Sequence, residues 1–308
     1  MSDQGLPEAQ AETISAFGED PYVGAVINNR YLIEKELGRG GIGVVYLARD
    51  RSLHSKPVVV KVLLDESAQD AWFKKKFRQE IEALARIDHP GVVGAIDAGA
   101  TPDGKPFLVM QFIKGQTLRS LMSNEGMDFD IVAQVIRQTS RALNAAHDEG
   151  IIHCDLKPEN LMLQDLNEDD PQVKILDFGI AKVRNSKVAP GSDSTQVAGT
   201  IPYMAPEQIA GKPSALSDVF ALGVIAYEML TGRRPFNPRS QLQILDELRA
   251  GIRVKPKDLR PELPEAAQEA VLKALSFNPA DRYSRASEFG EALSRALTAE
   301  SSSTQEPA

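Results

Sequence analysis

The amino-acid sequence predicts an α+β protein with a small β-rich lobe followed by a larger, mostly α-helical lobe. Short β-branched runs separated by turn residues occupy the early part of the chain, whereas helical periodicities dominate after Leu118. The chain of 308 residues is long enough to bury a separate core in each lobe.

Four strands are expected in the small lobe. Tyr31–Leu37 and Val44–Ala48 flank a glycine-rich turn, Pro57–Leu64 is a β-branched run, and Phe107–Phe112 is an apolar run.

An amphipathic helix is expected between the third and fourth of these strands, and the turn at 89–91 should end it. Its apolar stripe recurs at spacings of three and four and consists of Phe73, Phe77, Ile81, Leu84 and Ile87. In the larger lobe, helical patterns cover Phe129–His147 and Ser217–Leu230, and Val173–Leu176 is predicted to be a strand.

The low apolar content of the two ends predicts a flexible extension at 1–30 and a flexible tail at 298–308, with a folded domain at 31–297 between them. Within that domain we expect an N-lobe at 31–110, a hinge at 111–115 and a C-lobe at 116–297.

Composition excludes several classes of function. The hydrophobic content of 42%, the charged content of 25% and the net charge of −8 are ordinary for a soluble protein, and no basic run is long enough for nucleic acid. We expect no signal peptide and no membrane segment, because the longest apolar stretch, Val219–Leu230, is about half a membrane span. A single cysteine rules out an internal disulfide, which favours a reducing, cytoplasmic location.

The most informative stretch runs from His153 to Asn160 with the sequence HCDLKPEN, and Asp-Phe-Gly follows at Asp177. Phosphoryl transfer from ATP to a hydroxyl requires this set of groups. Asp155 can accept the hydroxyl proton, Lys157 can balance charge on the moving phosphoryl group, and Asn160 and Asp177 can bind magnesium. The stretch resembles the catalytic loop of eukaryotic-type (Hanks-type) serine/threonine protein kinases, and the style of the sequence resembles their bacterial branch. The resemblance implies the two-lobed protein-kinase fold.

A glycine-rich turn precedes this stretch, with the G-x-G-x-x-G spacing that brings backbone N–H groups close to phosphate oxygens. The same spacing occurs in dinucleotide-binding turns and in plain hairpins. Here Val44–Leu47 continues as a strand rather than a helix, which favours the kinase interpretation. The residues concerned are Leu37, Gly38, Arg39, Gly40, Gly41, Ile42, Gly43, Val44 and Val45.

Lys61 ends an apolar strand that resembles the V-A-I-K strand of kinases, and an inward lysine needs a carboxylate or phosphate partner. The resemblance implies an ion pair with Glu80 that positions Lys61 on the α- and β-phosphates of ATP. Glu82 is a competing carboxylate, but it points about 200° away from Glu80 around the helix. An exposed edge lysine and a solvated glutamate are the alternative.

The resemblance also assigns the adenine pocket. Met110 would be the gatekeeper, and backbone groups of Gln111 and Ile113 would bond the adenine edge. Leu37, Val45 and Met162 would sandwich the ring, and Val59, in place of the usual Ala, should narrow the pocket. For each apolar residue, plain core packing is the alternative.

Asp177–Glu207 resembles an activation segment. Thr200 in its peptide-docking stretch is implied to contact Asp155 and Lys157, and the candidate phosphorylation sites are Ser192, Ser194, Thr195 and Thr200. Family analogy pairs Glu207 with Arg282. It also implies that Asp218 braces the backbone of the catalytic loop.

The function predicted is that of a non-specific serine/threonine protein kinase that uses ATP and Mg²⁺, with Mn²⁺ as an alternative, and phosphorylates proteins, including itself. Lys157 argues against a tyrosine kinase. A pseudokinase-type nucleotide-binding scaffold and a small-molecule phosphotransferase with a kinase fold stay open as alternatives. Bacterial members of the family often dimerise through the small lobe, so a homodimer is also open.

Cys154 departs from the family pattern, because most members have an Arg there that pairs with a phosphate on the activation segment. A thiol cannot make that bidentate contact. We interpret Cys154 as a buried, inert residue, and a redox switch is the alternative. We therefore predict that replacing Ser192, Ser194 and Thr195 together with Ala leaves most of the kinase activity, measured as phosphate transfer to a protein substrate. A loss of about a hundredfold, the scale of a lost catalytic contact, would contradict this prediction.

Overall fold

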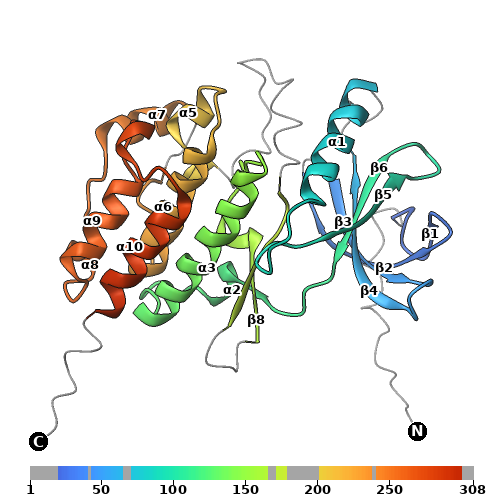
Figure 1. Ribbon diagram of the computed structural model, residues 1–308, viewed down its shortest axis with the longest axis horizontal. Helices are drawn as coiled ribbons and strands as arrows, with labels where there is room; N and C mark the ends of the chain where they lie inside the picture. The colour runs from blue at the N-terminus through green and yellow to red at the C-terminus, as the bar shows by residue number, and fades with distance from the viewer. Residues whose placement is uncertain are drawn as a thin grey trace, which may run out of the picture.

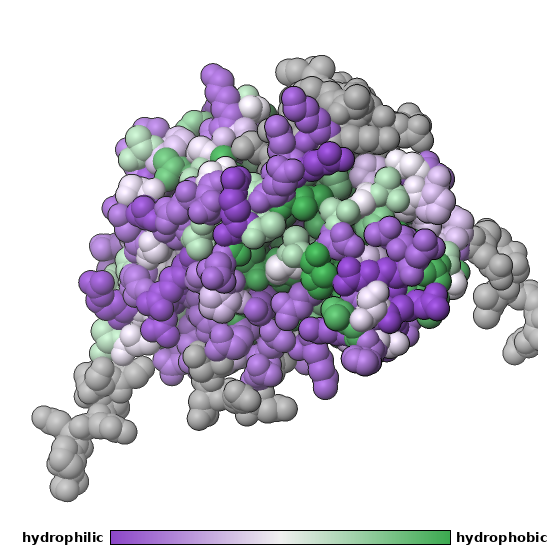
Figure 2. Space-filling view, turned by 45° about the vertical axis from the view of Figure 1, so that its right-hand side comes forward, coloured by the Kyte–Doolittle hydropathy of each residue, from purple (hydrophilic) through white to green (hydrophobic). Residues whose placement is uncertain are grey.

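The computed structural model describes residues 20–40, 43–64, 71–165, 171–178, 201–237 and 241–299. These residues form a β-rich lobe and a helical lobe that lie beside each other, as expected from the sequence (Figure 1). In the space-filling view, hydrophobic residues gather near the middle of the molecule, and hydrophilic residues cover most of the rest of that face (Figure 2).

The N-lobe is built on a six-stranded antiparallel sheet with the order β1-β2-β3-β4-β6-β5. One helix, α1 (Ala71–Leu84), lies beside this sheet (Figure 1). The strands are β1 (Val26–Ile27), β2 (Tyr31–Arg39), β3 (Gly43–Asp50), β4 (Lys56–Leu63), β5 (Ala95–Ala100) and β6 (Pro106–Gln111). The four strands expected from the sequence are present, and β1 and β5 are additional.

Residues 20–30 correct the expected boundary of the flexible extension, because they are folded onto the N-lobe. Ile27 is 1% exposed and pairs with Tyr31 across β1 and β2. Tyr22 is 7% exposed, and its hydroxyl donates to Asp103 at 2.9 Å. A few well-placed apolar side chains are enough to fix this segment, although its average apolar content is low.

The C-lobe surrounds helix α6 (Ala215–Thr231), which is buried on all sides. Around it pack α3 (Phe129–Asp148), α9 (Glu265–Ala274) and α10 (Ala286–Thr298). The buried apolar residues of these helices belong to one continuous core. Among the described residues, no helix has both the length and the apolar character needed to span a membrane.

Shorter elements complete the C-lobe. A three-stranded antiparallel sheet contains β7 (Gln116–Thr117), β8 (Leu161–Gln164) and β9 (Gln172–Ile175). The other helices of the described residues are α2 (Leu118–Leu121), α5 (Pro206–Ile209), α7 (Gln241–Ala250) and α8 (Pro256–Leu259), with 3₁₀ turns η2 (Pro158–Asn160), η4 (Ile201–Tyr203) and η5 (Pro279–Asp281).

Gly290 allows α10 to approach α3 closely. A Cβ at this position would lie 2.6 Å from the Cβ of Ser140 and 3.2 Å from the carbonyl oxygen of Ile136. Gly290→Ala should therefore lower the free energy of unfolding by about 1–3 kcal/mol in urea denaturation, despite the better helix propensity of Ala. Gly94→Ala is the control, because its Cβ would meet nothing within 4 Å. Equal stability of the two variants would show that the helices separate at little cost.

Candidate active site

The loop that carries Asp155 is anchored to α6 through Asp218. This carboxylate is 1% exposed and accepts the backbone N–H of His153 at 2.8 Å and of Cys154 at 3.0 Å. The Nε2 atom of His147 is 2.8 Å from the same side chain. Asp218 lies in the first turn of α6, where the helix dipole favours a negative charge. The loop therefore has a fixed position relative to the core of the C-lobe.

His153 links this loop to the strand that precedes Asp177. Its ring is buried, and Nε2 lies 2.8 Å from the carbonyl oxygen of Leu176, which can only accept. Nε2 therefore carries the proton, and Nδ1 accepts the backbone N–H of Asp155 at 3.2 Å. The ring also packs on Phe178, with the centroids 4.8 Å apart.

Asp155, Lys157 and Asn160 converge. The Nζ atom of Lys157 is 2.9 Å from Oδ2 of Asp155. The amide nitrogen of Asn160 donates to the carbonyl oxygen of Asp155 at 2.7 Å and lies 3.3 Å from its Oδ2. The Asp155 side chain is 26% exposed, so it is oriented by neighbours and still accessible to a substrate hydroxyl.

Lys61 and Asp177 join the two lobes. The Nζ atom of Lys61, on β4, lies 2.9 Å from Oδ1 of Asp177, which follows β9. Burial disfavours the charged form of Asp177, but Lys61 more than offsets this effect and keeps the pKa of the carboxyl below its ordinary value. Asp177 is therefore an anion at neutral pH.

The expected Lys61–Glu80 ion pair is not tested by the structure, because the side chain of Glu80 lies outside the described residues. Its backbone belongs to α1, as predicted. The competing carboxylate, Glu82, is exposed.

The residues present fit a magnesium ion. The ionised carboxylate of Asp177 is a hard oxygen ligand, and the amide nitrogen of Asn160 is engaged with Asp155, which leaves its Oδ1 as the ligating atom. The described residues contain no cluster of three or more His, Cys, Asp or Glu side chains suited to a metal. Two protein ligands suit Mg²⁺, which commonly completes its shell with substrate phosphates and water.

The glycine-rich turn is a hairpin. The backbone groups of Gly40 and Gly43 bond each other in both directions, with N–O distances of 2.9 and 3.3 Å. A Cβ on Gly43 would lie 2.2 Å from the carbonyl oxygen of Val62, so only glycine fits there. The Arg39 side chain pairs with Asp20 and with Glu36 on its own strand. Gly41 and Ile42 lie outside the described residues.

Several residues assigned to the adenine pocket share one apolar cluster. Met110 and Ile113 are 8% and 6% exposed, and Val59 and Met162 pack against the same cluster. Leu37, in contrast, is 46% exposed on β2, and Val45 pairs with Lys61 between β3 and β4. The N–H of Gln111 donates to Gly94, so an adenine contact there must use its carbonyl group.

A small cavity lies between the lobes, and Met110 lines part of it. Its walls come from both lobes and include Leu84, Leu108, Asp177 and Phe178. Asp177, which pairs with Lys61, and Met110 and Leu108 of the apolar cluster therefore lie around the same cavity.

Comparison with known proteins identifies this arrangement. The sequence-family model described as the protein kinase domain matches residues 31–294 of this chain. The chain belongs to the protein kinase domain family. It is 38% identical over 277 residues to the serine/threonine-protein kinase pkn3 of Myxococcus xanthus, covering 88% of this chain and 50% of that protein. It is also 38% identical over 274 residues to the serine/threonine-protein kinase PknB of Mycobacterium tuberculosis, covering 87% and 43%.

A solved structure supports the same assignment. The kinase domain of PknI of Mycobacterium tuberculosis superposes with a TM-score of 0.68 at 25% identity, over 89% of this chain and 98% of that chain. These findings confirm the predicted kinase fold and the resemblance to the bacterial branch. The chain spans half or less of the length of the two curated relatives above.

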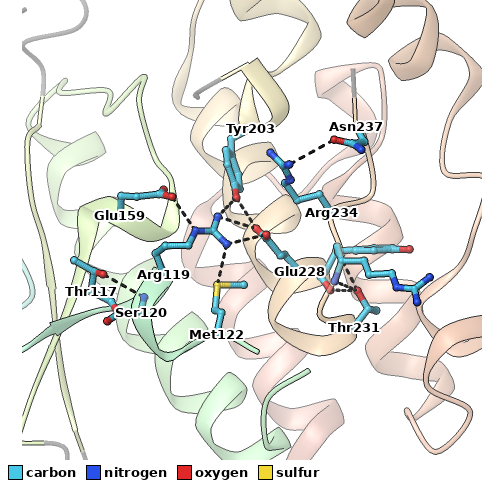
Figure 3. A network of polar contacts seen from close by, with 12 residues as sticks. Thr117, Arg119, Ser120, Met122, Glu159, Tyr203, Glu228, Thr231, Arg234 and Asn237 are labelled. Carbon is cyan, nitrogen blue, oxygen red and sulfur yellow. Dashed lines mark hydrogen bonds and ion pairs between the residues drawn. The ribbon is translucent and has the colours of Figure 1, made fainter. Parts of the chain in front are cut away.

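A second network in the kinase domain was not predicted from the sequence. Arg119 on α2 donates to Glu159 at 2.8 Å and to Glu228 at 2.9 Å, and it also bonds the hydroxyl of Tyr203 (Figure 3). Burial and the Glu228 carboxylate together raise the pKa of Tyr203. The network joins the catalytic loop, η4 and α6. The one signal in the sequence was Glu228 itself, a carboxylate in an apolar helix that requires a partner.

Glu207 and Arg282 form the ion pair expected by analogy. The Arg282 side chain is fully buried, and its guanidinium group donates two hydrogen bonds to the Glu207 carboxylate, at 2.8 and 3.0 Å. Burial alone would raise the pKa of Glu207, but Arg282 and Ser217 more than offset it and keep the pKa below its ordinary value. Ser192, Ser194, Thr195 and Thr200 lie outside the described residues.

We predict that Arg282→Ala lowers the free energy of unfolding by about 3–5 kcal/mol, because it leaves the Glu207 carboxylate, which is 14% exposed, without its partner. Arg285→Ala is the matched control. The side chains of Arg285 and its partner Asp148 are 50% and 58% exposed, so losing this ion pair should lower the free energy of unfolding by less than about 1 kcal/mol. Chemical denaturation measures both.

The same ion pair predicts a pH dependence. Because folding lowers the pKa of Glu207, its contribution to stability is complete above the ordinary value of 4.5 and is lost as the pH falls through the folded-state value. The difference between the parent and Arg282→Ala should therefore shrink below about pH 4.5. A difference that stays constant at acidic pH would contradict the assigned role of Glu207.

Proposed function

We propose that this chain is an ATP-dependent serine/threonine protein kinase and that Asp155 is its catalytic base. The observation that carries the proposal is the convergence of Asp155, Lys157 and Asn160 in one anchored loop next to the Lys61–Asp177 pair. The curated relatives, which are serine/threonine kinases, support the same reaction.

Each group has a defined task in this proposal. An Asp155 carboxylate oxygen accepts the proton of the substrate hydroxyl as that oxygen attacks the γ-phosphorus of ATP. Lys157, 2.9 Å from that carboxylate, stabilises the charge on the transferred group. Lys61 has three N–H donors, so it can bind phosphate oxygens and still contact Asp177. A magnesium ion bound by Asn160 and Asp177 would neutralise phosphate charge.

The substrates and setting are proposals of the same kind. We infer that Ser and Thr residues of proteins are phosphorylated, including those of the chain itself, with Mg²⁺ as the metal and Mn²⁺ as a substitute. The single cysteine and the use of ATP favour a cytoplasmic location. A homodimer is proposed from the family resemblance alone.

The first test is phosphate incorporation with Mg²⁺ and ATP, followed by intact mass and phosphopeptide mapping. The parent should gain phosphate on Ser or Thr, and Asp155→Asn should lower the rate by at least about 10²-fold because it removes the base. Asp165→Asn, an exposed site with the same chemical change, is the control and should behave as the parent.

The outcomes separate the alternatives. No phosphate in any variant, together with ATP binding, would favour a nucleotide-binding scaffold and reject the kinase proposal. Equal rates for the parent and Asp155→Asn would reject Asp155 as the base. Transfer to small alcohols but not to proteins would favour a small-molecule phosphotransferase.

A further inference from the structure

The peptide group between Cys154 and Asp155 is the last backbone unit before the proposed catalytic base. Cys154 has a φ of 63°, in the left-handed region that residues with a side chain rarely adopt. A non-glycine residue stays there only where its surroundings compensate for the strain. The partners of this peptide group therefore affect where Asp155 points.

The N–H of this peptide group, that of Asp155, donates to Nδ1 of His153 within the same loop. The preceding peptide group is held separately, because the Cys154 N–H donates to Asp218. The partner of the carbonyl group comes from a different segment. The carbonyl oxygen of Cys154 accepts a hydrogen bond from Nε2 of Gln208, at 2.6 Å.

Gln208 is itself firmly placed. It belongs to α5, which begins at Pro206 and is separated by two residues from η4 (Ile201–Tyr203), the described end of the stretch proposed to dock the peptide substrate. The preceding residue, Glu207, is bonded to the buried Arg282 and to the hydroxyl of Ser217. The Gln208 side chain therefore reaches the catalytic loop from a rigid base, and its bond to a backbone carbonyl does not depend on which side chain occupies position 154.

We propose that Gln208 is a positioning residue for Asp155, and this inference rests on the proposed function. By fixing the Cys154–Asp155 peptide plane, it couples α5 and the end of the peptide-docking stretch to the orientation of the base. In this chain a thiol replaces the arginine that would respond to phosphate. The Gln208 bond provides a connection between these segments that requires no phosphate.

The test uses two variants of similar size to glutamine. Gln208→Met removes the donor, and Gln208→Glu replaces it with a carboxylate that can only accept and faces the carbonyl oxygen. Both should lower kcat by about 10- to 100-fold, since small errors in the position of a catalytic group have effects of this size. The KM for ATP should stay within about twofold, because the nucleotide contacts lie elsewhere. Gln243→Glu, on the exposed face of α7, is the matched control and should have parental kinetics.

Thermal unfolding and hydrogen exchange complete the test. The melting temperature reports whether a variant is folded, and exchange measured over residues 151–158 reports the catalytic loop directly. Faster exchange in this loop in Gln208→Met, with the fall in kcat and an unchanged KM, would support the proposal. Parental kcat in both variants, or unchanged loop exchange in a folded variant, would overturn it. If the parent transfers no phosphate, the proposed function fails, and the exchange measurement still decides whether Gln208 orders the loop.

Discussion

The active site depends on one buried carboxylate, that of Asp218. It accepts two successive backbone N–H groups of the catalytic loop from the first turn of a helix that is buried on all sides. Without it, two buried donors would lose their acceptor, at a cost of about 1–3 kcal/mol each. Because α6 is packed into the core of the C-lobe, this bond transfers the rigidity of the core to the loop that carries Asp155. The left-handed backbone at Cys154 is maintained by the same contacts.

The second requirement is that the two lobes meet at the right place. Lys61 extends from an apolar strand of the N-lobe, and Asp177 follows a strand of the C-lobe, so their 2.9 Å contact sets the relation between the lobes at the site. Asp177 has a φ of 58°, so it is a second residue with left-handed backbone beside the loop. His153 connects the two strained positions, since its ring bonds the carbonyl of Leu176 and packs on Phe178. Strain concentrated at a site and supported by its surroundings is typical of functional residues.

Charged residues within apolar runs show what the sequence can predict about contacts and what it cannot. Lys61, Glu228 and Asp218 each stand in an apolar run, so the sequence alone indicates that each needs a partner. It does not indicate which one. Among the described side chains, Lys61 pairs with Asp177, more than a hundred residues away, and Glu228 pairs with Arg119, in a helix of only four residues. Gln208 gave no signal, because a glutamine in a short polar helix is ordinary at any protein surface.

The sequence was sufficient to predict the four main strands of the N-lobe, the helices α3 and α6, the fold family and the candidate reacting groups. Local hydrophobic periodicity and fixed motif spacing carry that information within a few residues. Three further features became visible only in the folded chain: the packing of residues 20–30 onto the N-lobe, the pairing of Lys61 with Asp177, and the contact of Gln208 with Cys154. Each of these depends on segments far apart in the chain being brought together by burial of apolar surface. Their distances and angles are properties of the packed lobes, and no local pattern in the chain encodes them.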